Sequence, residues 1–490
     1  MKNTPTTHTT TPPAATRRDF LKTSMLMGLG LGASSLLKLS APAARAAARG
    51  DLHSTGDISL TRPRPAGNKP VYNLTTKPLD KVRVAIIGLG QRGSMVINDL
   101  LGIDFVEITA LCDIRKDLVD RALKKSKDRR GFTPRAYFGD ENQWEKLVAQ
   151  DDIDVVYVDT PWDWHVIMCE KTMLAGKHAF VEVAAALTVD ECWRLVDMSE
   201  KTQRHCPILE NCCYGEEELF VLNMARQGVF GTLTHGECAY LHDLRSMLFN
   251  LGTEGDWRRE YHKRLNGNLY PTHGFGPVCQ YLNVGRGDNL KFVVSASSPE
   301  AALSEYLKEK NPNNGRHAGE TYVCGDMNTS IIKTELGRTI MLQHNVVASR
   351  PYSRINALYG SKATFFDYEP RLAVDNGSAY GLSAKNSDHW LKDADMKIMR
   401  EKFTHPLWRQ LQARAKKSGH GGMDYVMSYR MLDCIRQGIT PDMTVYDAAM
   451  WSCMIELTSQ SVESGSQPMP VPDFTRGAWK TIQPLGIVTA

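Results

Sequence analysis

The chain has 490 residues, 42% hydrophobic and 23% charged, a balance that suits a globular protein of about two or three domains. The formal net charge of +4 becomes −1 without residues 1–46, which carry six Lys or Arg and one acid, so the composition excludes a strongly basic nucleic-acid-binding protein. Eleven scattered cysteines, with no CxxC pair and no zinc-site spacing, predict core thiols and no metal site.

The N-terminus has the features of an export signal. The motif TRRDFLK at 16–22 precedes a modest apolar stretch at 25–39 and an A-x-A cleavage pattern at 44–46. This order predicts a twin-arginine signal peptide over residues 1–46, and hence export of the folded protein to the periplasm or beyond by the twin-arginine translocation machinery. A membrane anchor is the alternative, but the apolar stretch is broken by Lys38, whereas a span needs about 20 apolar residues. Residues 47–80 are predicted to form an irregular arm.

A dinucleotide-binding motif follows. The β-branched run at 82–87 predicts a buried parallel strand, and the next six residues complete a G-x-G-x-x-G motif before a helix. A second strand at 106–112 ends in Asp113, where a carboxylate can accept both ribose hydroxyls and would repel a 2′-phosphate. NAD is therefore favoured over NADP, although Arg115 weakens the preference. An ordinary strand-turn-helix is the alternative. The candidate cofactor residues here are Gly88, Gly90, Gln91, Arg92, Gly93 and Asp113.

Alternating elements continue the pattern. Helices at 117–127, 166–175 and 188–203 and strands at 155–158 and 179–181 predict a doubly wound α/β sheet, an NAD-binding Rossmann domain over 81–211. Ligands of such sheets bind beyond the carboxyl ends of the strands, so the segments 160–165, 182–183 and 210–211 should border the nicotinamide. The cofactor candidates in them are Trp162, Asp163, Trp164, His165, Glu182, Val183 and Asn211.

The remaining residues, 212–490, are predicted to form an α+β substrate domain. The β-forming segments, which predict an open and mainly antiparallel sheet, are 232–241, 291–296, 328–335, 338–347 and 355–360. The other face of this sheet would be free to pair two subunits in a homo-oligomer. Residues 361–418 are charged and without periodicity, and are expected to form an irregular wrap or lid over the site. A helix is expected near 445–465.

The glycine motif, the strand-end loops and the C-terminal helix resemble the glucose-fructose oxidoreductase and inositol dehydrogenase superfamily. Within it, the chain resembles glycoside hydrolase family 109, the NAD-dependent α-N-acetylgalactosaminidases, at six segments: PWDWH (161–165), LENCCY (209–214), HDLR (242–245), LYPTHG (269–274), RPY (350–352) and GHGGMDY (419–425). Dehydrogenases of the superfamily usually carry Glu-Lys-Pro where this chain has Glu182-Val183-Ala184, so a simple polyol dehydrogenase is disfavoured.

The resemblance implies a redox-assisted hydrolysis. Hydride transfer from sugar C3 to NAD makes the C2 proton removable, the aglycone leaves C1, water adds back and the NADH restores C3. The NAD would be tightly bound and recycled, which suits a compartment without a free pool. By resemblance His273 and Tyr270 are catalytic, and Tyr270 also contacts NAD. The implied substrate-binding residues are Tyr214, Tyr240, Arg258, Tyr270, Pro271, Thr272, His273 and Tyr352.

Two other functions stay open at this stage. One is a periplasmic NAD(P)-dependent sugar or polyol oxidoreductase of the same superfamily, and the other is an exported sugar-binding protein with a vestigial dinucleotide. Single His or Tyr side chains are usually structural, and His420, between glycines, could either reach the site or satisfy a buried turn. The residues alone leave the anomer and the galacto or gluco configuration open.

Overall fold

The computed structural model describes residues 61–489, which lie within one compact unit. The signal-peptide motifs at 1–46 fall outside the described residues. Residues 61–80 contain neither helix nor strand, but they are held by specific contacts. The Val71 N–H donates to the Tyr446 hydroxyl (3.1 Å), and Arg64 pairs with Glu200 (2.9 Å). Within the described part of the chain, no helix combines the length and the apolar character needed to cross a membrane.

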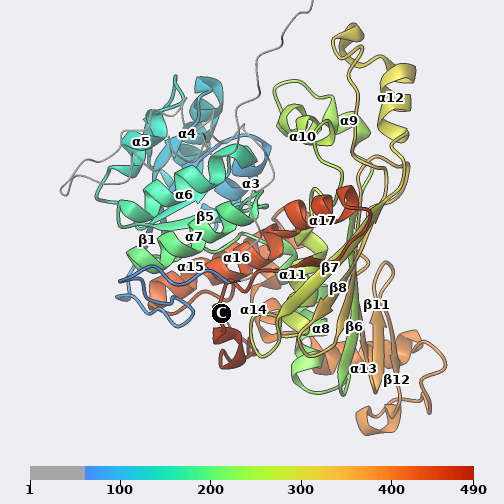
Figure 1. The fold of residues 1–490 in the computed structure, drawn as a ribbon. Coiled ribbons are helices and arrows are strands. Elements are labelled where there is room, and N and C mark those ends of the chain that lie inside the picture. Colours follow the sequence, from blue (N-terminus) through green and yellow to red (C-terminus); the bar gives the residue numbers. More distant parts are fainter. Residues whose placement is uncertain (1–60, 490) are drawn as a thin grey trace, which may run out of the picture. The chain divides into compact units, whose positions relative to one another are not determined.

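The first half of the fold is a parallel sheet of five strands in the order β3-β2-β1-β4-β5 (Figure 1). Its strands are β1 (Val82–Ile87), β2 (Val106–Cys112), β3 (Arg135–Tyr137), β4 (Val155–Val158) and β5 (His178–Val181). The connecting helices are α3 (Gln91–Leu100), α4 (Lys116–Arg130), α5 (Gln143–Val148), α6 (His165–Leu174) and α7 (Val189–Thr202). Strands β4 and β5 are buried throughout because helices cover both faces, which explains their unbroken apolar sequences.

This architecture confirms the predicted doubly wound sheet. The sequence missed β3 and α5, which are too short and too polar to give a periodic signal. A short helix, η1 (Trp162–Trp164), follows β4 and runs directly into α6. The carboxyl ends of β1, β2, β4 and β5 share one edge of the sheet, where their loops meet.

The second half is built on an eight-stranded sheet in the order β12-β11-β10-β6-β9-β8-β7-β13. Its strands are β6 (Leu233–Leu241), β7 (Leu290–Ser297), β8 (Asn328–Thr334), β9 (Thr339–Asn345), β10 (Ala357–Gly360), β11 (Ala363–Phe366), β12 (Arg371–Val374) and β13 (Met469–Pro470). Only the β6–β9 pair is parallel among these described strands, which confirms an open, mainly antiparallel sheet.

Six helices between residues 211 and 310 also belong to the second half of the fold. They are η2 (Asn211–Tyr214), α8 (Glu216–Arg226), α9 (Arg245–Leu248), α10 (Glu254–His262), α11 (Thr272–Tyr281) and α12 (Ala302–Lys310). Helix α11 packs on β6 at Gly236, where a Cβ atom would meet the Val278 side chain at 2.5 Å. Opposite this face, Val294, Ile331 and Met341 are only partly covered, and Ile331 is 44% exposed.

The prediction that residues 361–418 are irregular is wrong. Strands β11 and β12 extend the sheet, and two helices follow, α13 (Asp393–Phe403) and α14 (Pro406–Ala415). Helix α13 buries Met399 and Phe403 and packs against α8. Most of its charged residues face solvent, although Asp395 is buried, and they obscured the short apolar stripe in the sequence. Pro406 starts α14 instead of ending a helix.

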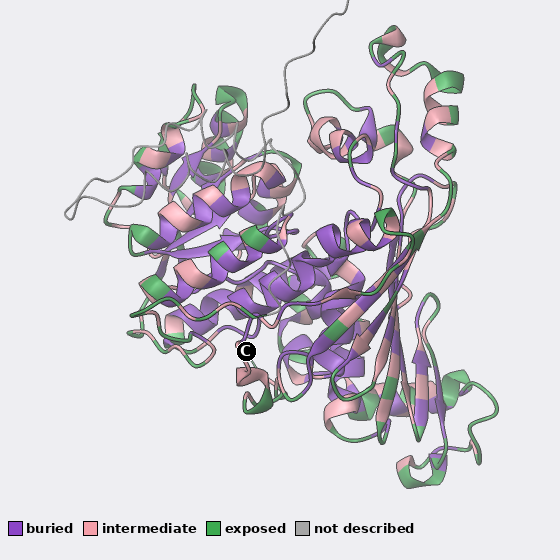
Figure 2. Ribbon diagram, in the orientation of Figure 1, coloured by how far each residue is buried: buried purple, intermediate pink, exposed green. Residues whose placement is uncertain are grey.

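The C-terminal helices return to the first half of the chain. They are α15 (Met423–Gln437), α16 (Val445–Ser452) and α17 (Met454–Glu463), so the single helix expected near 445–465 is two helices that meet at Cys453. Helix α15 packs on α3, α16 packs on α7, and α17 packs on β7 (Figure 1). All three are largely buried (Figure 2), so they join the two sheets through a shared core.

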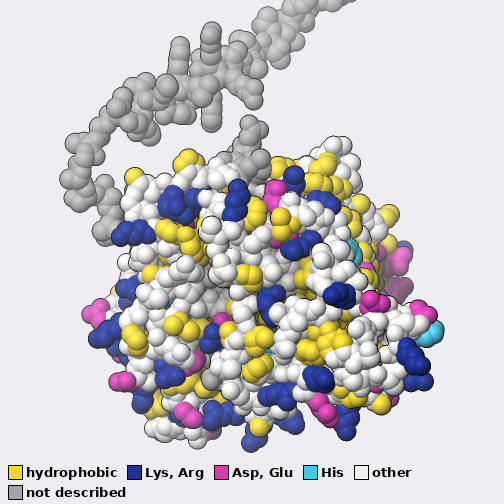
Figure 3. All heavy atoms as spheres, turned by 90° about the horizontal axis from the view of Figure 1, so that it is seen from below, with side chains coloured by type: hydrophobic (Ala, Val, Ile, Leu, Met, Phe, Trp, Pro, Cys, Tyr) yellow, Lys and Arg dark blue, Asp and Glu magenta, His cyan; other side chains and the backbone are white. Residues whose placement is uncertain are grey.

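The charge distribution on the surface and the burial of the cysteines agree with what the composition predicts. On the face shown in Figure 3, Lys and Arg side chains are interspersed with acidic and hydrophobic ones and do not gather in a stripe. All eleven cysteines lie in the described residues, and each is buried as a free thiol. The vicinal residues Cys212 and Cys213 are buried like the others, which agrees with the predicted core thiols.

Candidate active site

A cavity of about 1610 Å³ opens at the carboxyl edge of the parallel sheet and is lined by both halves of the chain. The first half contributes the glycine motif and Asp113, and the second half contributes Tyr240, Tyr270 and His273. None of residues 361–418 lines it, so the predicted lid is wrong. The side of the cavity where a lid was expected is instead formed by residues between Leu244 and Arg258, which lie in the loop and helices after β6.

The glycine motif fits a dinucleotide. A Cβ atom on Gly88, whose φ is +92°, would meet the Asp159 carbonyl oxygen at 2.4 Å, and one on Gly93 would meet the Gly88 oxygen at 2.0 Å. Gly90 has no neighbouring atom within 4 Å of that position, which leaves the approach that a pyrophosphate needs. No side chain caps the N-terminus of α3, so its first-turn N–H groups can bind an anion.

Asp113 fits the ribose of NAD. One carboxylate oxygen accepts the Leu89 N–H (2.7 Å) and the other accepts the Arg115 N–H (2.8 Å), which fixes the carboxylate at the end of β2. Each oxygen keeps a lone pair for a ribose hydroxyl. The Arg115 guanidinium pairs with Asp117 at 3.0 Å, so it already has a carboxylate partner near the place where a 2′-phosphate would lie. This arrangement favours NAD.

A charged network lies where the sequence predicts the nicotinamide. Arg92 donates from Nε to Glu182 (2.6 Å), and its Nη1 lies 2.9 Å from Asp424. Asp424 also accepts from Asn211 (2.6 Å) and pairs with His420 Nδ1 (2.7 Å). Burial would raise the pKa of Asp424, but the charge of Arg92 and the hydrogen bond from His420 outweigh it and lower that pKa. Asp424 was missed from the sequence because 332 residues separate it from Arg92.

The Pro-Trp-Asp-Trp-His segment builds a wall of the cavity. Trp162 and Trp164 line it, and Trp162 Nε1 donates to the Val183 carbonyl oxygen (3.0 Å). His165 lies behind the wall, with ring nitrogens 2.7 Å from the Ala184 oxygen and 2.8 Å from the Thr160 oxygen, so it joins the loops after β4 and β5. Asp163 is also placed outside the lining, where it accepts from Tyr261 (2.7 Å).

Aromatic rings gather where the cavity reaches the second half. Tyr270 stacks on Tyr240 with centroids 4.6 Å apart, and its ring meets the His273 ring edge-on at 4.8 Å. The Arg258 guanidinium carbon lies 4.8 Å from the Tyr270 centroid, and Arg258 Nε is buried without a hydrogen-bond partner among the described residues. Burial raises the pKa of Tyr270 well above its usual value, although Arg258 opposes this. Tyr352 meets Tyr240 edge-on at 6.0 Å.

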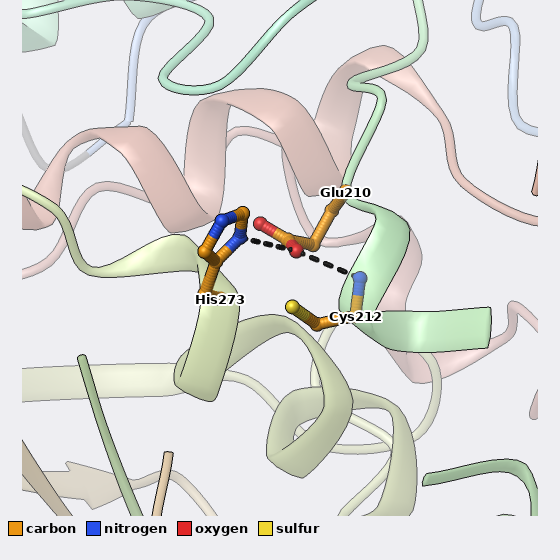
Figure 4. A group of neighbouring side chains, drawn as sticks. All are labelled: Glu210, Cys212 and His273. Atoms are coloured by element: carbon orange, nitrogen blue, oxygen red, sulfur yellow. Dashed lines mark hydrogen bonds and ion pairs between the residues drawn. The ribbon is translucent and has the colours of Figure 1, made fainter. Parts of the chain in front are cut away.

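His273 is held by a carboxylate that the sequence did not single out as a site residue. His273 Nδ1 lies 2.8 Å from Glu210 Oε1, and the Cys212 N–H donates to the same oxygen at 3.0 Å (Figure 4). One ligand atom of each residue lies within 4.8 Å of the others, so the three could also be grouped as cation ligands. The hydrogen bond between His273 Nδ1 and Glu210 Oε1 already pairs two of these residues.

Four predicted substrate residues are not in the cavity lining, namely Tyr214, Pro271, Thr272 and Tyr352. The Tyr214 hydroxyl donates to Asp442 (3.1 Å) in a buried cluster on the other side of η2, so the structure places this side chain away from the site. Pro271 and Thr272 form the buried start of α11, where they position the neighbouring Tyr270 and His273.

Sequence comparisons identify the relatives of the chain. The family described as "Glycosyl hydrolase 109, C-terminal domain" matches residues 214–481, and "Oxidoreductase family, NAD-binding Rossmann fold" matches residues 82–208. A glycosyl hydrolase family 109 protein of Shewanella putrefaciens is 46% identical over 430 residues, covering 87% of this chain and 92% of that protein. A protein of Shewanella oneidensis named alpha-N-acetylgalactosaminidase is 44% identical over 436 residues, covering 89% and 94%.

Solved structures share the fold at low sequence identity. An oxidoreductase from Agrobacterium radiobacter, solved in complex with NAD⁺, L-tartaric acid and magnesium, matches with a TM-score of 0.55 and 14% identity, over 80% of this chain and 98% of that one. These comparisons confirm the predicted fold, the NAD-binding Rossmann domain and the family that the motifs resemble. With relatives of this identity covering most of its length, the chain belongs to glycosyl hydrolase family 109.

Proposed function

We propose that the protein hydrolyses terminal α-N-acetylgalactosamine linkages with an NAD that is tightly bound and recycled. The observation that carries this proposal is the cavity itself, which runs from the glycine motif and Asp113 to His273 and Tyr270. A dinucleotide site and a proton-handling pair therefore share one space. The relative named alpha-N-acetylgalactosaminidase supports the choice of sugar.

The residues present suit redox-assisted elimination. Bound NAD supplies a reversible hydride acceptor, which makes the proton beside the oxidised sugar carbon removable. His273 Nδ1 faces Glu210, so the free ring nitrogen, Nε2, is the one that can take a proton. Tyr270 keeps its phenolic proton, because burial raises its pKa, and can donate it to the leaving oxygen. The unpartnered Arg258 Nε can stabilise negative charge that develops on the sugar.

Hydrolysis by a free carboxylate pair is less compatible with these contacts. That mechanism needs one carboxyl group as acid and a second as nucleophile or base, on either side of the glycosidic bond. Glu182 is bound to Arg92, and Glu210 is bound to His273 and to the Cys212 N–H. Glu182 and Glu210 therefore act through other residues.

Export of the folded holoenzyme completes the proposal. The twin-arginine motif at 16–22 and the cleavage pattern at 44–46 support a periplasmic or secreted enzyme that loads NAD before translocation. Tight retention would suit a compartment without free NAD and would stabilise the fold by linkage. The partly covered face at Val294, Ile331 and Met341 supports pairing of two subunits.

The function is tested by assaying purified protein without added NAD on p-nitrophenyl α- and β-N-acetylgalactosaminides and the matching glucosaminides in heavy water. The expected result is cleavage of the α-galactosaminide with deuterium at C2 of the released sugar. Stripping the NAD should abolish cleavage, and adding NAD should restore it. Sugar oxidation with consumption of added NAD, and no cleavage, would instead indicate the oxidoreductase alternative.

A further inference from the structure

We propose that Glu210 is a positioning residue, which holds His273 in the tautomer protonated on Nδ1 and leaves Nε2 as the proton acceptor on the cavity side. The proposal rests on the proposed function and adds a residue outside the cavity lining to its machinery. The proposal is based on the contact between the fully buried carboxylate of Glu210 and the imidazole of His273, which lines the cavity (Figure 4).

The Glu210 carboxylate is held in place by its own segment of the chain. The residue is 0% exposed, and Oε1 accepts the Cys212 N–H at 3.0 Å, so the side chain caps η2 while it faces His273. Ile208, two residues earlier, forms a parallel bridge with Val181 at the end of β5. Among the described residues, His273 is the only basic side chain within ion-pairing distance of Glu210. The carboxylate therefore faces a single basic group.

The helix that carries His273 is docked closely against Glu210. A Cβ atom on Gly276, one turn after His273, would lie 3.0 Å from Glu210 Cγ and 3.1 Å from Cys213 Sγ. On the opposite side, a Cβ atom on Gly274 would lie 2.4 Å from the Ala239 backbone nitrogen. Two glycines thus let α11 fit between η2 and β6, and the 2.8 Å contact is set by backbone packing.

The charge pattern gives Glu210 its role. When His273 takes a proton on Nε2, the ring becomes a cation in a buried site, where a neighbouring carboxylate is worth far more than in water. The other titratable groups around the ring are Tyr240, Tyr270, His242, Arg258 and Cys212. None of them supplies an anion, because burial raises the pKa values of both phenols and of the thiol. Burial alone would raise the pKa of Glu210, but His273 and the hydrogen bonds outweigh it and lower that pKa, so the carboxylate stays ionised.

The first test compares Glu210→Gln with Glu456→Gln, a matched change of another buried carboxylate, located in α17 and outside the cavity lining. Glu210→Gln should lower kcat by roughly 100-fold or more, with little change in KM or in bound NAD. Its activity should also extend to lower pH than that of the wild type, because the imidazolium has lost its counter-charge. Glu456→Gln should keep the wild-type kcat and pH profile. A wild-type profile in Glu210→Gln would overturn the proposal.

A second measurement separates this proposal from the proposed function. Histidine labelled with ¹⁵N, compared between wild type and His273→Gln, identifies the ring signals of His273 without any substrate. Above about pH 8, where an ordinary imidazole is neutral, the wild type should show a proton on Nδ1, and Glu210→Gln should show a mixture of tautomers. A wild-type ring protonated on Nε2 would refute the positioning role even if the glycosidase assay succeeds. If no N-acetylhexosaminide is cleaved, the proposed function fails and the tautomer still decides the role of Glu210.

Discussion

Tyr270 stacks on Tyr240 with a centroid separation of 4.6 Å and an angle of 29° between the ring planes. Tyr240 comes from β6 and Tyr270 from the residues just before α11, so the sheet and the helix together fix both phenols. The stack also buries the Tyr270 hydroxyl beside Arg258, and burial keeps the phenol protonated. The fold thus fixes the phenol that we propose as the proton donor before a sugar arrives.

Replacing His273 should separate catalysis from cofactor binding. His273→Ala is expected to lower kcat by about 10²- to 10⁴-fold, because it removes the proton acceptor, while NAD per protomer stays unchanged since the glycine motif and Asp113 are intact. Turnover of a p-nitrophenyl glycoside and the NAD released on denaturation measure the two effects. His235→Ala, on β6 and outside the cavity lining, is the control and should keep full activity. Equal activity in both variants would exclude His273 from the reaction.

Asp113 should control NAD retention. Asp113→Asn keeps an oxygen for the Leu89 N–H but loses charge-assisted bonds to the ribose, each worth about 1.5–3 kcal/mol, or roughly 10- to 100-fold in affinity. The purified variant should therefore contain less NAD and need added cofactor for activity. Asp117→Asn removes a nearby exposed carboxylate and should retain NAD. An unchanged NAD content in Asp113→Asn would contradict the ribose assignment.

Gly274 should be required for stability. In Gly274→Ala the new methyl group would lie 2.4 Å from the Ala239 nitrogen and 2.6 Å from its oxygen, so α11 must shift from β6. Overpacking of this kind costs about 1–3 kcal/mol, which denaturant unfolding can measure. Gly486→Ala is the control, since no atom lies within 4 Å of its Cβ position. Equal unfolding midpoints for the two variants would show that the helix has room to move.

His420 should make stability depend on pH. The hydrogen bond with Asp424 raises the pKa of His420 above that of the unfolded chain, so the stabilisation is fully present below pH about 6.5 and is lost as pH rises through the higher folded value. The difference in unfolding midpoint between wild type and His420→Gln should therefore shrink from pH about 6 toward alkaline pH. A difference that grows over this range would reverse the assigned sign.

Export should depend on the paired arginines. Arg17→Lys combined with Arg18→Lys is expected to leave the unprocessed precursor in the cytoplasm, because the twin-arginine translocase reads both residues. Cell fractionation and immunoblotting would follow precursor and mature forms. Lys22→Arg keeps both arginines and should be exported normally. Processed protein outside the cytoplasm in the double variant would point to another route.

Local patterns were enough to predict the dinucleotide half. The strand at 82–87, the glycine motif and Asp113 are contiguous or closely spaced, and each follows a short-range rule of packing or hydrogen bonding. Family resemblance supplied Tyr240, Arg258, Tyr270 and His273, which the fold does bring to one cavity. It also suggested Tyr214, whose hydroxyl instead bonds to Asp442.

Long-range partners were beyond the reach of the sequence. Asp424 meets Arg92, and Glu210 meets His273, only after two sheets and the returning helices have packed. The segment 361–418 failed for another reason, because short amphipathic elements with charged outer faces look irregular in a single sequence.

The return of α15 to α3 has a consequence for synthesis of the chain. Asp424 and Asn211 complete a network that begins at Arg92 in the Rossmann half, so the first half alone does not contain all of its members. During synthesis from the N-terminus, Arg92 lacks this carboxylate partner until residue 424 has been added. The charged network can therefore be complete only after most of the chain has left the ribosome.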